Sequence, residues 1–199
     1  MIFPRFLSIF VIEMHIRKAR MDDLKNIMEI YGIAQDFMIE SGNPKQWGHR
    51  YPGEDLIRDD IDKGVCCLVC EGESPHGVFA LFSGDEPTYQ YIENGEWLND
   101  NPYVTIHRIA SDGKIRGIFA CAVDYCRNFC DDVRIDTHES NLVMQGLIEK
   151  NGFQRCGTIY VADGSPRIAY QWSRSICLLE KFKKKIRCLE NKNNFLINI

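Results

Sequence analysis

The chain lacks an excess of positive charge. Among its 199 residues, 24 are Lys or Arg and 28 are Asp or Glu, which gives a formal net charge of −4. A protein that holds nucleic acid along an extended surface needs a basic field, and this composition does not supply one. We therefore expect no nucleic-acid partner, and any bound anion must be held by a local group of residues.

The chain also lacks an uninterrupted apolar run long enough to span a bilayer, which takes about 20 residues. The apolar run at residues 1–12 is shorter, is followed by no small-residue cleavage site and is interrupted by Glu13. Met14 is a second potential start. Residues 1–13 are therefore either an N-terminal extension without a role in the fold or an added edge strand, and we expect no membrane partner.

The nine cysteines do not follow a disulfide or zinc pattern. Their number is odd and they lie in apolar segments such as residues 65–70, which is typical of a reduced, cytoplasmic protein. Cys67 and Cys70 have zinc-knuckle spacing, but no second pair has ligand spacing, and on an alternating strand the two side chains point to opposite faces. We predict that they pack in the core, and we expect no metal.

Periodicity and turn residues predict one domain at residues 14–172, followed by a basic, Asn-rich tail at 173–199. Helices are expected at 22–40, 54–63, 114–130 and 141–150, and strands at 15–18, 65–71, 78–82, 103–110, 133–137, 153–161 and 168–172. A turn at 72–76 is expected to join the second and third strands. The alternation of strands and helices between residues 103 and 150 implies parallel pairing, and the closing hairpin implies a mixed sheet.

The segment from Arg108 to Cys121 joins a strand to a helix through a basic turn that contains Gly113 and Gly117. The N–H groups that start a helix have no partner within it, and the positive end of the helix dipole lies there. Lys114 and Arg116 add charge, and the glycines allow close approach of the backbone. The turn predicts a site for a phosphate-like anion. A helix cap with solvated charges is the alternative.

Over residues 14–172 the chain resembles the GNAT N-acetyltransferase family, in the predicted order of strands and helices and in two motifs. Residues Lys114 to Phe119 (KIRGIF) are similar to the family's Gln/Arg-x-x-Gly-x-Gly/Ala turn, with the central Gly117 kept and the first and last residues changed. Residues Asn141 to Phe153 are similar to the family's Asn-x-x-Ala-x-x-Leu-Tyr-x-x-x-Gly-Phe element, with Ile148 in the place of the Tyr.

The resemblance implies a fold and a reaction. The fold is α+β, a three-layer α/β/α arrangement with a mixed, mostly antiparallel sheet of six to seven strands around a central parallel pair and about four helices. The reaction transfers an acetyl group from acetyl-CoA to a primary amine of a small-molecule or amino-acid-like acceptor, by direct attack on the thioester. A non-catalytic acyl-CoA-binding regulator with the same fold is the alternative, because Ile148 removes the usual general acid. A homodimer is left open.

The resemblance also implies which residues meet acetyl-CoA, mostly through backbone groups. The N–H of Ile109 is the implied donor to the developing oxyanion, and the bulk of Phe119 is expected near the pyrophosphate. The implied cofactor residues are Ile109, Ala110, Ser111, Lys114, Ile115, Arg116, Gly117, Ile118, Phe119, Ala120 and Asn141.

Candidates for the acid–base roles lie near the carboxyl ends of the expected parallel strands, where ligands bind in such sheets. His107 and the pair His138 and Glu139 are candidate bases. The structural alternative for His107 is a partly buried histidine on a strand, bonded to a neighbour. The alternative for His138 and Glu139 is helix capping ahead of Asn141. Tyr160 or Cys156, or water, is the candidate acid. An outward, core-packed tyrosine is the structural alternative for Tyr160.

Aromatic and acidic side chains predict the acceptor pocket. The stretch at residues 85–101 is rich in both and has no clear periodicity. Trp47, Tyr89 and Trp97 are candidates for cation–π contact with a cationic amine. The alternative is a solvated loop held by anchoring aromatics. The basic segment from Lys181 to Arg187 is interpreted as part of a solvated tail, with contact to an acidic surface as its alternative.

Overall fold

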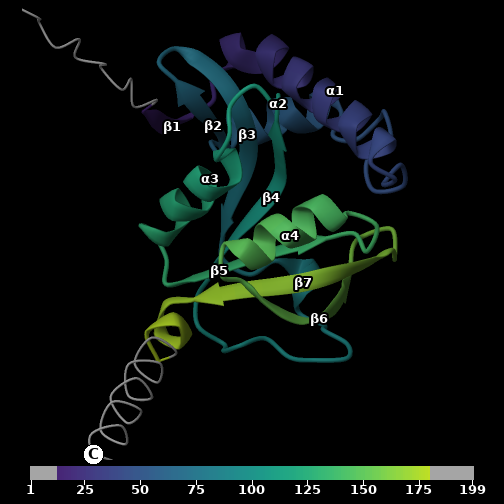
Figure 1. Ribbon diagram of the computed structural model, residues 1–199, viewed down its shortest axis with the longest axis vertical. Coiled ribbons are helices and arrows are strands. Elements are labelled where there is room, and N and C mark those ends of the chain that lie inside the picture. Colours follow the sequence, from purple (N-terminus) through teal and green to yellow (C-terminus); the bar gives the residue numbers. More distant parts are fainter. Residues whose placement is uncertain (1–12, 180–199) are drawn as a thin grey trace, which may run out of the picture.

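The computed structural model describes residues 13–179. A seven-stranded sheet with the order β1-β2-β3-β4-β5-β7-β6 forms its centre (Figure 1). The strands are β1 (Met14–Lys18), β2 (Cys66–Glu71), β3 (Ser74–Ser83), β4 (Val104–Ser111), β5 (Asp132–Thr137), β6 (Gln154–Tyr160) and β7 (Pro166–Ser173). The helices are α1 (Leu24–Glu40), α2 (Glu54–Asp62), α3 (Ile118–Arg127) and α4 (Leu142–Lys150), with short 3-10 turns η1 (Met21–Asp23) and η2 (Pro87–Tyr89).

Two apolar clusters on opposite sides of the sheet make up most of the core. Ile27 of α1 and Ile57 of α2 pack against one face, with Leu68 of β2. Ala122 of α3 and Ile148 of α4 pack in the other cluster, and Figure 1 shows α1 and α3 on opposite sides of β2 to β4. The predicted three-layer fold with a mostly antiparallel sheet is confirmed.

The parallel pair is β4 and β5, and the two strands pair over a short length. Val104 is opposite Val133 and Thr105 is opposite Arg134, and no further register partner follows between these two strands within the described residues. Both strands nevertheless continue, to Ser111 and Thr137. Their carboxyl ends are therefore not paired with each other, and groups there are available for other partners.

Strand β4 contains one extra residue relative to β3. Val78 is opposite Ala110 while Ala80 is opposite His107, so the register shifts between these pairs. The shift reverses the alternation of side chains: Ile106 and Ile109, three residues apart, both pack in the cluster below α3, and Ala110 packs in the cluster below α1. A β-bulge has this effect.

Most predicted elements are present, with clear differences in the third helix and in the first hairpin. Helix α3 spans Ile118–Arg127 with Gly117 as its N-cap, so the predicted helix at 114–130 was too long. The turn between β2 and β3 is confined to Gly72 and Glu73, because Ser74 and Pro75 already pair with Glu71 and Cys70. The predicted turn at 72–76 was therefore too long. Residues 1–12, interpreted as an extension or an added edge strand, and the basic segment from Lys181 to Arg187 lie outside the described residues.

The cysteines of β2 are buried as predicted. Cys67 packs in the cluster with α3, and Cys70 packs in the cluster with α1, so the two thiols lie on opposite faces. In residues 13–179 no group of three or more His, Cys, Asp or Glu side chains is arranged to hold a metal ion. Over the same range, no helix combines the length and apolar character needed to cross a membrane.

Candidate functional site

His107 lies on β4, just beyond the last residues that pair with β5. Its Nε2 is 3.2 Å from Oε2 of Glu86, which precedes the short turn η2. Glu86 is fixed by a second contact, because its Oε1 accepts hydrogen bonds from the N–H and the hydroxyl of Thr88. The hydrogen bond from His107 is the main reason that the pKa of Glu86 falls to about 2 from 4.5, against the opposing effect of burial.

A second carboxylate lies on the other side of the imidazole. Oδ2 of Asp136, on β5, is 4.0 Å from Nδ1 of His107 and accepts a 2.8 Å hydrogen bond from the Tyr89 hydroxyl. Asp136 is level with His107 along the diverging strands, because each lies two residues past the last paired residues, Arg134 and Thr105. His107 is therefore flanked by Glu86 and Asp136, and Tyr89 closes one side.

This cluster contains the parts of a proton acceptor. When Nε2 carries the proton and donates it to Glu86, Nδ1 has a free lone pair. Glu86 then holds the ring and stabilises the positive charge that forms when Nδ1 takes up a proton. The side chains of His107 and Asp136 are 20% and 11% exposed, so they are partly shielded from water but not sealed from it.

The turn that follows β4 presents backbone N–H groups at the start of α3. Gly117 is the N-cap residue with φ 91°, and no side chain caps the helix. The first bond of the helix joins the N–H of Cys121 to the carbonyl of Gly117, so earlier N–H groups have no partner in the helix. Lys114 and Arg116 are exposed beside them. The arrangement fits a phosphate group.

Phe119 does not lie near this turn's outer surface, and here the expectation from the sequence was wrong. Its side chain is 6% exposed and packs in the core with Ile118 and Ala122. The first turn of α3 thus directs the Phe119 side chain into the core, whereas the N–H groups at a helix start point along the helix axis toward its N-terminus. The bulk of Phe119 therefore does not cover the N–H groups of residues 118–120, which we call the cradle.

Asn141 caps α4 and also reaches the loop after α1. Its Oδ1 accepts the N–H of Met144, and its Nδ2 donates to Oε1 of Gln46. The same Gln46 oxygen accepts from Nδ2 of Asn43. Asn141, a predicted cofactor residue, thus lies where the loop between α1 and α2 meets the start of α4.

Comparison of the chain with known proteins supplies its family. No family model matches, and no curated protein matches either. Among solved structures, a GNAT-family acetyltransferase from Streptococcus agalactiae is 33% identical, with a TM-score of 0.73, covering 80% of this chain and 95% of that one. The chain belongs to the GNAT acetyltransferase family.

More distant structures share the fold. A GNAT-family acetyltransferase from Bacillus cereus is 22% identical with a TM-score of 0.53, covering 81% of this chain and 98% of that one. YncA from Salmonella typhimurium, in a structure with its cofactor acetyl-CoA, is 16% identical with a TM-score of 0.51, covering 81% and 94% of the two chains. The GNAT fold therefore accounts for most of the chain.

In this GNAT protein, His138 and Glu139 lie beyond the end of β5. Nδ1 of His138 accepts the N–H of Ser140, and burial is the main reason that the pKa of His138 is lowered. Glu139 is exposed, and its carbonyl accepts from Gln145. Both residues therefore help to form the approach to α4, and in the part of the chain that the structure describes neither is hydrogen-bonded or ion-paired to His107.

The two candidate acids are in different environments. The Tyr160 side chain is exposed, its hydroxyl donates to Glu93, and its ring stacks on Tyr91 at 6.4 Å. Cys156 is buried, and burial raises the pKa of its thiol. Tyr160 is at the carboxyl end of β6, the same edge as the end of β5, whereas Cys156 is enclosed.

The three aromatic candidates for acceptor binding have distinct positions. Tyr89 is buried, and its hydroxyl reaches the His107 cluster through Asp136. Trp47 makes edge contact with Tyr31 at 5.8 Å, in the loop before α2. The face of Trp97 is occupied, because the Arg134 guanidinium lies 4.0 Å from its centroid. Trp97 therefore anchors the loop at residues 85–101 to the sheet.

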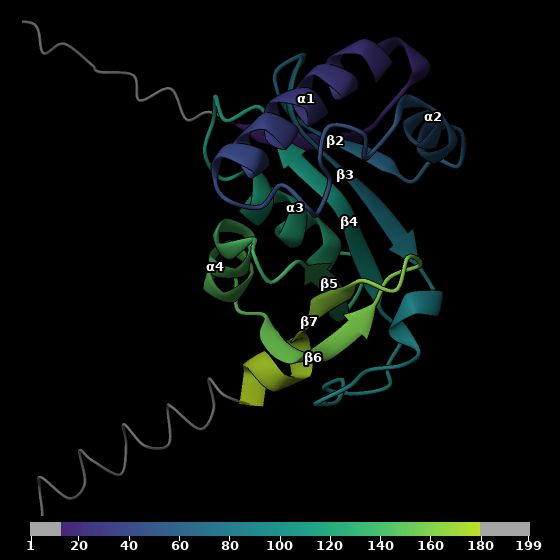
Figure 2. The ribbon, with the colours of Figure 1, turned by 90° about the vertical axis from the view of Figure 1, so that its right-hand side faces the viewer.

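The segment between β3 and β4 is held against the sheet along its length. Figure 2 shows it beside β6, where Glu93 and Thr158 form an isolated bridge. Farther along, Asn99 donates to Asp132, and the Leu98 N–H donates to Gln171. These contacts fix the part of the segment that follows η2, which has no regular helix or strand.

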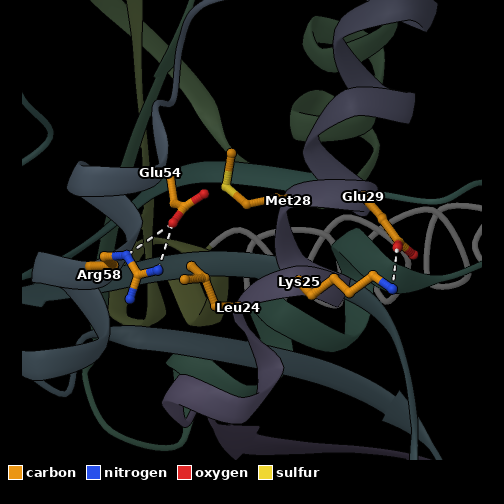
Figure 3. Close-up of a pocket in the computed structure, with 6 residues that line it drawn as sticks. All are labelled: Leu24, Lys25, Met28, Glu29, Glu54 and Arg58. Atoms are coloured by element: carbon orange, nitrogen blue, oxygen red, sulfur yellow. Dashed lines mark hydrogen bonds and ion pairs between the residues drawn. The ribbon is translucent and has the colours of Figure 1, made fainter.

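A separate hollow of about 480 Å³ is lined by residues from the N-terminal parts of α1 and α2 (Figure 3). Its lining residues are Leu24, Lys25, Met28, Glu29, Glu54 and Arg58. The charges around it are already paired, since Arg58 donates to Glu54, and Lys25 lies 4.0 Å from Glu29. None of the predicted site residues lines it, so it is distinct from the His107 cluster.

Two residues of the cluster were not among the sequence-predicted catalytic candidates. Asp136 alternates with buried Ile135 near the carboxyl end of a parallel strand, and that position is a usable signal. Glu86 has no such signal, because it belongs to a stretch without periodicity. Only the folded chain brings it to His107.

Proposed function

We propose that this protein is an N-acetyltransferase that moves an acetyl group from acetyl-CoA to a primary amine of a small-molecule or amino-acid-like acceptor. The observation that carries the proposal is the position of His107 between Glu86 and Asp136, where β4 and β5 stop pairing. The same strand leads, four residues later, into the turn that offers N–H groups and positive charge. A proton acceptor and an anion cradle are thus connected by one strand.

Acetyl-CoA fits the residues that are present. The diphosphate would be held by the N–H groups before Cys121, with Lys114 and Arg116 as counter-charges. Gly117 is needed at the N-cap, because its φ of 91° suits glycine and an added Cβ would lie 3.2 Å from Met14. Bound acetyl-CoA supplies the thioester that the amine attacks.

The side chains around His107 prepare the amine. A protonated amine is attracted by the carboxylates of Glu86 and Asp136, and must lose a proton before it can attack. Nδ1 of His107 takes that proton while Glu86 holds the resulting imidazolium. The Ile109 N–H, two residues along β4, is the donor for the negative charge that grows on the carbonyl oxygen.

The departing thiolate needs a proton from a source other than the family's tyrosine position. Ile148 is 0% exposed and packs in the core, so that position supplies no acid. We propose that water serves, since Cys156 is enclosed and the Tyr160 hydroxyl is engaged by Glu93. The same Ile148 supports the second candidate function, a regulator that binds acyl-CoA without turnover.

Two measurements separate these functions. Calorimetry with acetyl-CoA tests the cradle, and absence of binding would reject both functions. Thiol release from acetyl-CoA with a panel of primary amines, with the acetylated product identified by mass, tests catalysis. Turnover with at least one amine is expected. Tight binding with no turnover across the panel would favour the regulator.

A further inference from the structure

Arg108 occupies a backbone conformation that side chains other than glycine rarely adopt. Its φ is +53°, and it lies in the bulge of β4, between His107 and Ile109. Neither Arg108 nor Ile109 has a register partner on β3 or β5. A strained residue of this kind persists only where its surroundings fix it, and such residues cluster at functional sites.

The Arg108 side chain is fixed by α2. Its guanidinium donates to both carboxylate oxygens of Asp60, at 2.8 Å and 2.7 Å from Nη2 and 3.1 Å from Nε. Asp60 is 2% exposed. Burial raises the pKa of this carboxyl, against the opposing effect of Arg108. A buried, bidentate pair has one favoured geometry, so it restrains the residue that carries it.

The Arg108 backbone is fixed by α1. The Tyr31 hydroxyl donates a 2.9 Å hydrogen bond to the Arg108 carbonyl. Tyr31 is 1% exposed, and burial raises its pKa well above the ordinary value, so the hydroxyl remains a donor at neutral pH. Trp47 packs against its ring.

The carbonyl that Tyr31 holds belongs to the same peptide unit as the Ile109 N–H. In a planar trans peptide these two groups point in opposite directions, so fixing one fixes the other. A hydrogen bond to the carbonyl also polarises the peptide and makes its N–H a better donor. Tyr31 on one face of the sheet therefore sets the direction and strength of a donor that points the other way.

We propose that Tyr31 and Asp60 are positioning residues that clamp Arg108 and thereby aim the Ile109 N–H at the thioester carbonyl of acetyl-CoA. This inference rests on the proposed function. It assigns a role in catalysis to α1 and α2, whose side chains lie on the far side of β4. The two contacts act on different parts of one residue, so each can be removed separately.

The first test removes only the hydroxyl of Tyr31. Acetyl-CoA labelled with ¹³C at the thioester carbonyl is bound to the wild type and to Tyr31→Phe, and the carbonyl stretch is measured by difference infrared spectroscopy. The wild type should lower the stretching frequency relative to free acetyl-CoA, and Tyr31→Phe should lose most of that shift. With an active amine, kcat should fall about tenfold while KM for acetyl-CoA stays nearly constant.

A matched control is Tyr170→Phe. Tyr170 is also fully buried, and its hydroxyl is 3.5 Å from Glu149, outside the clamp. Tyr170→Phe should keep the infrared shift. An equal loss in both variants would show that general loosening of the fold is responsible, and would overturn the proposal.

The second test uses glycine, which adopts positive φ without strain. Asp60→Asn is combined with Arg108→Gly or with Arg108→Ala, so that no buried carboxylate is left unpaired in either protein. The Gly protein should retain most of the infrared shift and turn over at least about tenfold faster than the Ala protein. Equal behaviour of the two proteins would overturn the proposal.

The results separate this inference from the proposed function. Failure of the wild type to bind acetyl-CoA would reject both. Binding with the same carbonyl frequency in the wild type and in Tyr31→Phe would reject only the clamp, and acetyl transfer would then need a different donor.

Discussion

Nε2 of His107 lies 3.2 Å from Oε2 of Glu86, although 21 residues separate the two along the chain. The contact joins a regular strand to the start of an irregular segment. It determines which imidazole nitrogen remains available to a substrate. The expected behaviour of several variants follows from it.

Replacement of His107 by Gln should remove the proton acceptor while keeping a polar side chain of similar size. We expect kcat/KM for the amine to fall by about 10²- to 10⁴-fold, with little change in acetyl-CoA affinity. Steady-state kinetics and calorimetry measure the two quantities. His15→Gln, at an exposed position on β1, is the control and should be unaffected. A His107→Gln enzyme with near-normal turnover would remove His107 from the mechanism.

The depressed pKa of Glu86 predicts a pH dependence of stability. Because its pKa is about 2 in the folded protein and 4.5 ordinarily, Glu86 stabilises the fold above pH 4.5, and this contribution is lost as the pH falls toward 2. The shift corresponds to roughly 3 kcal/mol at most, and less after screening. Urea denaturation from pH 2 to 6 should show wild type and Glu86→Gln converging at the acid end. A difference that stays constant would contradict this assignment.

Removal of the two positive charges beside the cradle should weaken only those contacts of acetyl-CoA that involve its diphosphate. For Lys114→Ala combined with Arg116→Ala, we expect the Kd for acetyl-CoA to rise about tenfold, since each exposed charge contributes only modestly. Acetyl-pantetheine lacks the diphosphate, so its affinity should be unchanged. Calorimetry with both ligands makes the comparison. Equal losses for both would mean that the turn acts on some other part of the ligand.

Restoration of the family's tyrosine at Ile148 should damage the protein rather than improve it. Ile148 is 0% exposed within the core cluster, and a larger, polar side chain there would cost about 1–3 kcal/mol through overpacking. Ile148→Tyr should therefore unfold at lower urea concentration, with no gain in kcat. Ile148→Val, which only trims the side chain, is the milder comparison. A faster and equally stable Tyr variant would show that the position can supply an acid.

Much of the fold could be predicted, because the helices and strands repeat apolar residues at their natural periods. The inward direction of Phe119 was also readable, since Ile118, Phe119, Ala122, Val123 and Cys126 form one helical stripe and are all buried. The family motif places position 119 in the turn, whereas the helical period predicts that the Phe119 side chain points into the core.

The His107 cluster and the bulge of β4 could not be predicted, because both depend on contacts between segments that are distant in the sequence. The meeting of Glu86, His107 and Asp136 joins three segments, and the one with Glu86 has no period to fix its path. The bulge was equally hidden, because Arg108 is not a residue type that signals positive φ. Its conformation results from partners on α1 and α2.

The extra residue in β4 has a consequence for a deletion in this strand. Val78 and Ala80 lie on one face of β3, so their partners Ala110 and His107 lie on one face of β4, although they are three residues apart. Deletion of Arg108 or Ile109 would leave His107 and Ala110 two residues apart, which is the ordinary spacing for one face of a strand. A deletion one codon long would thus keep the inside and outside of the downstream strand and remove only the bulge, together with the unpaired peptide between Arg108 and Ile109.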